Sequence, residues 1–237
     1  PLTPNTAPTF FLASQAPGKT VVPVGSVSGE IYRAALQADG KVVVVVGHPI
    51  SGGNQDFRIV RVNADGSPDT SFSGDGHLLL PLSAGDDSSR DVIALSSGKL
   101  LVVGQSFLPA TGMDFALTRL NADGSLDTSF SGDGMLLVDF AVSVDLVHSV
   151  VEQSDGKLVL AGNINTPQGR DFGLIRLNAD GSLDTTFNGT GKLTVGIETV
   201  GNATDEARSV IQQADGKLVV AGFSDTAGGG TRKFSLI

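Results

Sequence analysis

Short apolar runs recur along the whole chain and are separated by turn-forming residues, mainly glycine, aspartate, serine and asparagine. Four of these runs share one pattern: "ADGKVVVVVG", "SSGKLLVVGQ", "SDGKLVLAGN" and "ADGKLVVAGF". Their glycines, Gly40, Gly98, Gly156 and Gly216, lie 58, 58 and 60 residues apart. No stretch shows a sustained helical period, so the pattern predicts an all-β protein built from four repeats.

Each repeat holds four strand-like pieces. A first piece such as "DVIAL" precedes the Gly-Lys run, and the minimal turn between them is typical of a β-hairpin. A third piece such as "DFALTRLN" follows, and a fourth such as "MLLVDF" comes after a turn-rich string such as "NADGSLDTSFSGDG". Four-stranded sheets repeated at this length predict a β-propeller of four four-stranded repeats. A β-solenoid has shorter coils, and a row of sandwiches needs more residues per unit.

Proline and apolar content predict the order of the strands within a repeat. Pro23 and Pro81 occupy the same repeat position, and proline donates no hydrogen bond to a β-ladder, so this piece belongs at a sheet edge. The continuous apolar run after Gly-Lys predicts a buried middle strand. The expected order from inner to outer edge is therefore "DVIAL", "KLLVVG", "DFALTRL" and "MLLVDF".

The repeats divide the chain into a linker at residues 1–17 and a propeller at residues 18–237. The expected blades cover approximately residues 32–82, 90–140, 147–197 and 208–237, the last completed by 18–24. The segment "GKTVVPV" at 18–24 matches the outer strand "GHLLLPL", whereas the chain ends in "KFSLI", a third strand. We therefore predict that residues 18–24 pair with 232–237 and close the ring. Exchange of that strand between chains, giving a dimer or a filament, is the alternative.

Composition excludes several classes of protein. The net charge of −9 disfavours nucleic acid and anionic membranes as partners, because phosphate would be repelled. The chain has no cysteine, so it has neither disulfides nor thiol chemistry. Its longest apolar run, at 42–46, is too short to cross a bilayer, so we expect no membrane insertion. The start at Pro1, without a methionine or a basic leader, indicates a piece processed or excised from something larger.

The strings "DGKLVVAG", "DFxLxRLNADGSLDTSF" and those like "GDGK" resemble the Delta-60 repeats of bacterial proteins over roughly residues 18–237. The resemblance implies a β-propeller that occurs as a module of large secreted or surface-anchored bacterial proteins. It implies no enzymatic activity and transfers no catalytic residue. On this basis we expect an extracellular or cell-surface location, with other protein chains or cell-surface glycans as partners.

The repeated acidic residues allow two interpretations. They are Asn63, Asp65, Asp69, Asn121, Asp123, Asp127, Asn178, Asp180 and Asp184. As oxygen ligands they could hold calcium, but the order and the late glutamate of a calcium-binding EF-hand loop are missing. As turn residues they would accept hydrogen bonds from their own backbone, with glycine supplying positive φ. We favour turns, and expect no metal site and no cofactor, with calcium as the alternative.

Phenylalanine and arginine also recur. The strand positions Phe57, Phe115, Phe172 and Phe234 and the turn positions Phe72, Phe130 and Phe187 predict packing between neighbouring blades. Arginines at Arg61, Arg119 and Arg176 follow the strand phenylalanine by four residues and share its face. A half-buried arginine needs a carboxylate partner, and the turn aspartates are the candidates.

No catalytic constellation stands out. The histidines, His48, His77 and His148, form no metal-binding pair, and nucleophile-elbow and phosphate-loop motifs are missing. We expect a non-catalytic structural or interaction module, acting in scaffolding, self-assembly or adhesion. A carbohydrate-binding propeller, with or without calcium, is the alternative, and a glycan-active enzyme is the third class. Ligand-binding residues are not identified, although the variable loops "GHPISGGNQ", "GQSFLPATGM", "GNINTPQGR" and "GFSDTAGGGTR" are where we would look first.

Overall fold

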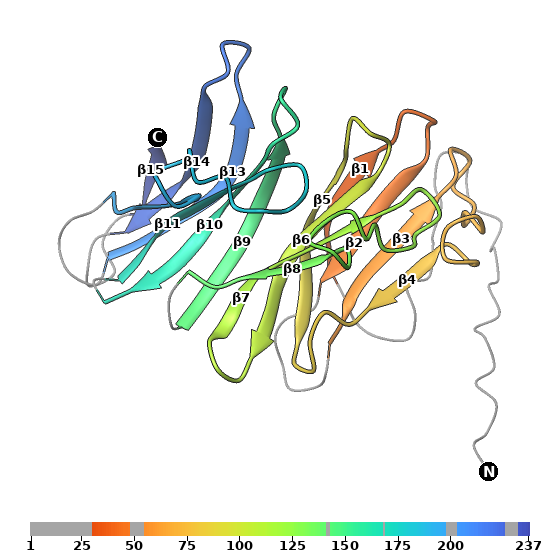
Figure 1. Ribbon diagram of the computed structural model, residues 1–237, viewed down its shortest axis with the longest axis horizontal. Helices are drawn as coiled ribbons and strands as arrows, with labels where there is room; N and C mark the ends of the chain where they lie inside the picture. Colours follow the sequence, from red (N-terminus) through yellow and green to blue (C-terminus); the bar gives the residue numbers. More distant parts are fainter. Residues whose placement is uncertain (1–29, 48–54, 141–142, 168, 198–202, 226–231) are drawn as a thin grey trace.

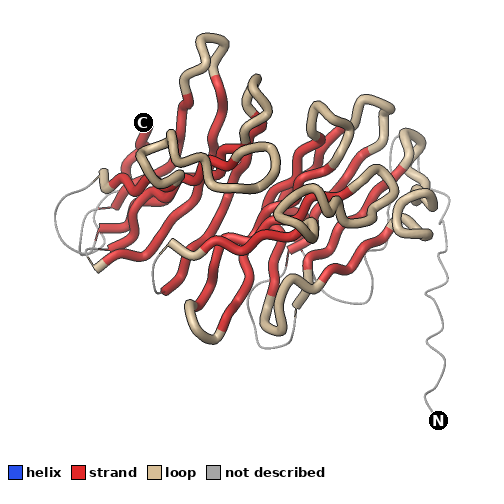
Figure 2. The backbone as a smooth tube through the Cα atoms, viewed as in Figure 1, coloured by secondary structure: helices blue, strands red, loops and turns tan. Residues whose placement is uncertain are grey.

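The structure, a computed structural model, describes residues 30–47, 55–140, 143–167, 169–197, 203–225 and 232–237. This part of the chain contains fifteen β-strands joined by turns and bends, and no helix (Figure 2). It therefore holds no apolar helix of membrane-spanning length. The all-β prediction is confirmed.

The strands form four consecutive units, which we call blades 1 to 4. Blade 1 contains β1 (Glu30–Leu36), β2 (Val42–Gly47), β3 (Phe57–Val62) and β4 (His77–Leu80). Blade 2 contains β5 (Asp87–Ala94), β6 (Leu100–Leu108), β7 (Gly112–Leu120) and β8 (Met135–Val138). Blade 3 contains β9 (Ser143–Glu152), β10 (Leu158–Thr166), β11 (Gly169–Leu177) and β12 (Lys192–Val195). Blade 4 contains β13 (Ala203–Gln212), β14 (Leu218–Asp225) and β15 (Lys233–Leu236).

Within each blade the strands pair antiparallel in chain order, as the repeat pattern predicts. The blades follow one another from right to left in Figure 1. The first strands of successive blades contact each other, so they form the inner edges. Consecutive blades are also joined by short parallel pairings, at Gly112 with Ser143 and at Gly169 with Ala203.

The inner strands begin earlier than the apolar pattern indicates. Strand β5 begins at Asp87 and β13 at Ala203, ahead of the apolar pieces that start near residues 90 and 208. Their early residues are mostly polar and pair with the second strand of their own blade, and Ala203 and Thr204 of β13 also pair with β11 of the preceding blade. Every inner strand also contains a β-bulge between its polar and its apolar part. Bulges bend a strand and redirect one side chain.

The core lies between the blades. Three apolar clusters join blade 1 to 2, blade 2 to 3 and blade 3 to 4. Phe57, Phe115 and Phe172 each pack onto the next blade and are fully buried. A Cβ atom at Gly104 in β6 would lie 2.0 Å from the Ser88 carbonyl oxygen and 2.9 Å from the Phe57 ring, so only glycine fits there. The predicted inter-blade packing of phenylalanine is confirmed at these junctions.

Phe234 is the exception, and its predicted place in the core is wrong. Its side chain is 77% exposed, whereas Phe172, at the same repeat position, is 0% exposed. No further blade follows β15 in the described residues, so the face that carries Phe234 and Leu236 is not covered. Burial at this repeat position therefore depends on having a neighbouring blade.

The predicted closure of the ring lies partly outside the described residues. Residues 18–24 are not described, so their pairing with 232–237 stays a prediction. In the described part of the chain β15 pairs with β14, and β4 forms the outer edge of blade 1 by pairing with β3. The outer-edge position predicted from Pro81 is thus confirmed.

Candidate functional site

The repeated turn after the third strand is held by its own aspartates. The Oδ1 atom of Asp123 accepts hydrogen bonds from the Ser125 N–H at 2.9 Å and the Ser125 hydroxyl at 2.6 Å. The next glycine, Gly124, adopts φ +88°, and the same geometry recurs around Asp65 and Asp180. These hydrogen bonds lower the pKa of the Asp123 carboxyl. The turn interpretation is confirmed for these residues.

The second aspartate of each turn pairs with the strand arginine. Arg119 Nε donates to Asp127 Oδ2 at 2.5 Å, and Arg61–Asp69 and Arg176–Asp184 repeat the pair. Lysine from the Gly-Lys turn joins it, with Lys99 Nζ 2.6 Å from Asp127 Oδ2. Burial alone would raise the pKa of Asp127, but hydrogen bonds from Lys99, Ser129 and Arg119 outweigh it and hold the pKa far below its usual range. The predicted structural pair is confirmed.

The same arginines also connect neighbouring blades. Arg61 donates to the carbonyl of Ala122, and Arg119 donates to the carbonyl of Ala179, in each case one blade further along the chain. Each guanidinium also lies over the turn phenylalanine of its own blade, as Arg119 does 4.8 Å from the Phe130 ring centre. Arginine and lysine thus pair with the second aspartate of each turn, Asp69, Asp127 or Asp184, and these contacts belong to the scaffold.

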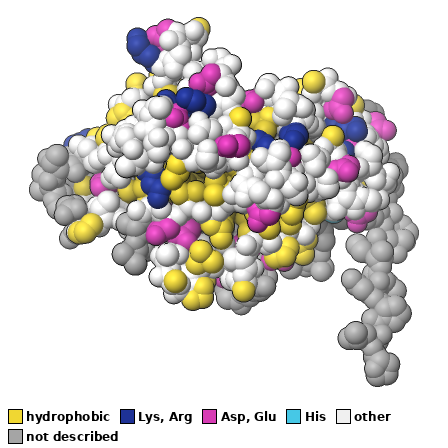
Figure 3. Space-filling view, in the orientation of Figure 1, with side chains coloured by type: hydrophobic (Ala, Val, Ile, Leu, Met, Phe, Trp, Pro, Cys, Tyr) yellow, Lys and Arg dark blue, Asp and Glu magenta, His cyan; other side chains and the backbone are white. Residues whose placement is uncertain are grey.

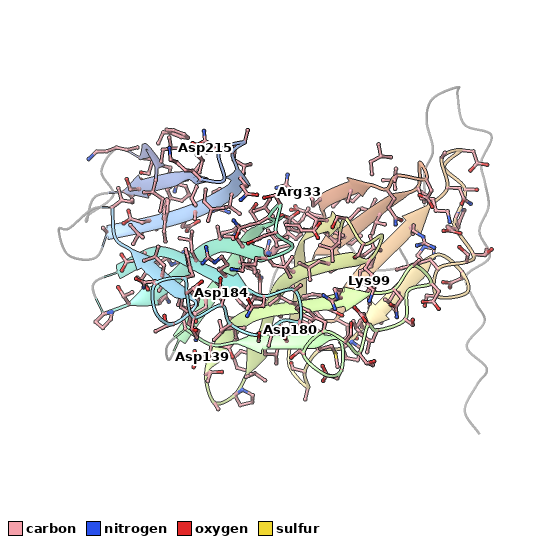
Figure 4. The ribbon with its side chains drawn as sticks, turned by 45° about the horizontal axis from the view of Figure 1, so that its top comes forward. Arg33, Lys99, Asp139, Asp180, Asp184 and Asp215 are labelled. Atoms are coloured by element: carbon pink, nitrogen blue, oxygen red, sulfur yellow. The ribbon has the colours of Figure 1, made fainter. Side chains whose placement is uncertain are left out.

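A groove of about 450 Å³ runs between the four inner strands. Arg33, Asp91, Ser149 and Ser209 line it at the same position of successive blades, and small or branched apolar residues follow each of them. Figure 4 shows Arg33 at this central position. This groove is a concave surface to which all four blades contribute.

Next to the groove, the four bulges present one tyrosine, one histidine and two arginines. They are Tyr32, Arg90, His148 and Arg208. Three of them contact the neighbouring strand of their own blade. Arg90 Nε donates to Gln105 Oε1 at 3.3 Å, His148 Nε2 lies 2.9 Å from Asn163 Oδ1, and Arg208 lies 5.5 Å from the Phe223 ring centre. We call these four residues the bulge ring.

The blades are connected within the bulge ring. The guanidinium of Arg90 lies 4.3 Å from the ring centre of Tyr32 in the preceding blade. Of the charged groups around the groove, Arg33 pairs with Asp91 at 3.0 Å, and Arg208 and Arg170 both pair with Glu206. In the described part of the chain no carboxylate lies within ion-pair distance of Arg90. Arg90 therefore differs from Arg208, the other arginine of the bulge ring, which pairs with Glu206.

Burial sets the protonation state of His148, and a hydrogen bond from Arg90 sets the orientation of Gln105. Burial first, and then the charge of Arg208, lowers the pKa of His148 to about 4, so the imidazole is neutral at pH 7. Because arginine can only donate, Arg90 fixes the amide oxygen of Gln105 toward itself. The Gln105 Nε2 group is then a buried donor with no acceptor among the described residues. The bulge ring thus supplies a cation, Arg90, and an aromatic ring, Tyr32, and the neighbouring Gln105 supplies an unused hydrogen-bond donor.

Repeated letters do not reveal this ring, because its position holds tyrosine, histidine and arginine in different blades. Each of the four bulge residues nevertheless stands eight residues before its repeated glycine. That spacing was the available signal. In the sequence alone, His148 is an isolated histidine, and the variable loops are the predicted binding surface. His48 and parts of three of those loops lie outside the described residues.

The described residues also contain a cluster of three carboxylates, Asp114, Asp139 and Asp145, whose oxygens lie within 4.8 Å of one another. It lies away from Arg33 and the groove, as the position of Asp139 shows (Figure 4). On the face shown in Figure 3, acidic and basic side chains are interspersed, without a broad area of one charge.

Comparison with family models gives one match. The model of a β-propeller domain of unknown function, DUF5122, matches residues 37–72, 95–130, 153–187 and 213–234, more than half of the chain. Each matched segment runs from the end of an inner strand to a repeated phenylalanine. No curated protein matches the sequence.

Three solved structures are similar to this chain at low sequence identity. A protein of unknown function from Dyadobacter fermentans is 13% identical with a TM-score of 0.50, covering 87% of this chain and 69% of that one. A protein of unknown function from Bacteroides caccae is 10% identical with a TM-score of 0.47, covering 89% and 62%. An endo-arabinase from Bacteroides thetaiotaomicron is 13% identical with a TM-score of 0.45, covering 88% and 74%. This chain spans less than two thirds of the Bacteroides caccae protein.

Proposed function

Because the chain belongs to the DUF5122 β-propeller family, a repeat family, we propose that it is a non-catalytic interaction module. Its resemblance to Delta-60 repeats supports placing it in an extracellular or surface-anchored bacterial protein. In this proposal, the bulge ring and the adjoining groove bind an anionic group of a partner, and the rest of the scaffold holds the four blades in register.

One observation carries the proposal. The scaffold otherwise repeats the same polar residues and pairs them internally, but the bulge ring varies at a single repeat position, with one tyrosine, one histidine and two arginines. A side chain needed for packing is expected in every blade, whereas a ligand-binding side chain is needed once. The two arginines differ in their partners: Arg208 pairs with Glu206, whereas the Arg90 guanidinium meets the Tyr32 ring and has no carboxylate partner in the described residues.

The acidic groups near the groove support a binding role over catalysis. The Asp91 carboxylate accepts hydrogen bonds from Arg33 and from the Val92 and Val150 N–H groups. Glu206 is held by two arginines. General acid–base catalysis of glycosidic bonds needs two carboxyl groups facing the substrate. Both of these are already engaged by protein donors.

An array of glycans and acidic peptides, probed with the purified chain, tests this function. We expect binding to carboxylate- or sulfate-bearing glycans or to acidic peptides, weakened at least tenfold by Arg90→Gln. Asp155→Asn, in an exposed turn far along the chain, is the control and should bind normally. Binding of neutral glycans that Arg90→Gln leaves unchanged would favour the carbohydrate-binding alternative. Hydrolysis of any bound glycan would show that the module is an enzyme.

A further inference from the structure

We propose that Asp114, Asp139 and Asp145 form a calcium site at the junction of blades 2 and 3. The proposal is independent of the function assigned to the bulge ring, because the cluster lies elsewhere in the molecule.

Each blade junction places two aspartates side by side. The pairs are Asp56 with Asp87, Asp114 with Asp145, and Asp171 with Asp205; in the latter two, the aspartates follow directly on the parallel pairing. In every pair the inner-strand aspartate accepts a hydrogen bond from the segment that connects the blades. Phe140 N–H donates to Asp145 Oδ2 at 3.0 Å, and Ile197 N–H donates to Asp205 Oδ2 at 2.7 Å. These inner-strand aspartates thus have a scaffold role that is common to the three junctions.

The middle junction alone has a third carboxylate at the end of the outer strand. Asp139 follows β8 directly, and the equivalent positions after β4 and β12 are Pro81 and Gly196. Since the connection is built without an acidic residue at the other two junctions, the backbone does not require Asp139. A third negative charge beside two buried ones therefore needs another explanation.

Asp114 supplies a second observation, which points to a missing cation. Its side chain is 99% buried, with 1% exposure, and Oδ2 accepts a hydrogen bond from the Thr111 hydroxyl at 2.6 Å. Its Oδ1 atom has no hydrogen-bond donor within the described residues, and the same holds for Asp139 Oδ1. A buried carboxylate oxygen without a donor is costly, and a metal ion in the cluster would satisfy it.

The charges around Asp114 act in opposite directions. Burial, and then the charge of Asp139, raise the pKa of the Asp114 carboxyl, while Lys192 opposes them. Lys192 directs its ammonium to the Asp139 carbonyl oxygen and lies 5.4 Å from the Phe140 ring centre. In the described residues it forms no ion pair with Asp114 or Asp139.

Oxygen chemistry and geometry favour calcium. Calcium takes six to eight oxygen ligands in flexible geometry, and carboxylates are its usual protein ligands, whereas magnesium demands a near-ideal octahedron. Three aspartates supply part of the shell, and Asp139, the most exposed of them, leaves the remainder to water. Sites of extracellular modules with few charged ligands bind calcium with dissociation constants of about 10⁻⁴–10⁻³ M.

Calorimetric titration of CaCl₂ into the full chain, stripped of metal with a chelator, tests the proposal. We expect one ion per chain in that affinity range and a melting temperature that rises by several degrees in excess CaCl₂. NaCl at equal ionic strength should give no such rise. Absence of binding, or an equal rise in NaCl, would overturn the site.

Two variants separate metal binding from structure. Asp139→Asn should lower calcium affinity at least tenfold and remove the calcium-dependent rise, whereas Asp155→Asn should retain both. Without calcium, Asp139→Asn should melt at or above the temperature of the unmodified chain, because it removes a like charge from the cluster. If Asp139→Asn instead melts several degrees lower without calcium, Asp139 is a structural residue and the proposal fails. Neither result affects the Arg90 test.

Discussion

The contrast between Phe172 and Phe234 gives the sharpest test of how the blades are held together. Both occupy the same position of the third strand, but the Phe172 side chain is fully buried against blade 4 and that of Phe234 is 77% exposed. Truncation of a buried phenylalanine to alanine costs about 3–5 kcal/mol of unfolding free energy. An exposed side chain loses little area from burial, so Phe234→Ala should cost less than about 1 kcal/mol.

Urea denaturation followed by circular dichroism measures both values on matched variants. For a chain of this size, the loss at Phe172 corresponds to a fall in melting temperature of roughly 6–20 °C. Phe234→Ala should stay within a few degrees of the unmodified protein. Equal losses at the two sites would refute the reasoning, since they would show that the outer face of blade 4 is covered in solution, by ring closure or by another chain.

Two further outcomes follow from the ion pairs and the buried histidine. Asp127→Asn leaves Arg119 without its partner and should destabilise the protein by about 3 kcal/mol at pH 7 in urea denaturation. Because the folded pKa of Asp127 is lowered, its contribution is present above the ordinary pKa of 3.8 and is lost as the pH falls, so the variant should lose less stability on acidification. The folded pKa of His148 is lowered from 6.5 to about 4, so stability should fall by about 3 kcal/mol as the pH drops through that window. His148→Gln should abolish that part of the pH dependence, and an unchanged slope would contradict the burial argument.

The fold followed from the sequence wherever the same letters recur. The antiparallel order of the strands recurs in all four repeats, and the four-stranded unit and the Arg119–Asp127 type of pair recur in the first three, so each repeat corroborates the others. The sequence motifs predicted Delta-60 repeats, whereas the family-model comparison supports a β-propeller repeat family, DUF5122. The exposure of Phe234 could not follow from its letters, because burial there is a property of the neighbouring blade.

The candidate sites were harder to predict because they depend on differences between repeats. Arg90 and His148 are unlike each other in sequence, and only a bulge at one register position brings them together. Asp139 likewise gains meaning only beside Asp114 and Asp145, which are brought to it by the parallel pairing of two blades. Because the strand ends that pair between blades are polar, the sequence shows no apolar period from which this pairing could be predicted.

The junctions between blades have a direction, and this bears on how such a chain can grow. The phenylalanine and the arginine of one blade contact the next blade along the chain. The ring of Phe57, for example, packs against Gly104 in strand β6 of blade 2. Blade 1 lacks this glycine, because Val46 stands at the position that Gly104 takes in blade 2. Val46 pairs with Arg58 there, as Gly104 pairs with Ala116. The contacts at one junction carry no information about how many others exist. Duplication or loss of one internal repeat in the gene would therefore keep the repeated phenylalanine and arginine contacts at the new junction. Contacts made by single residues, such as the ion pair of Arg33 with Asp91, would change.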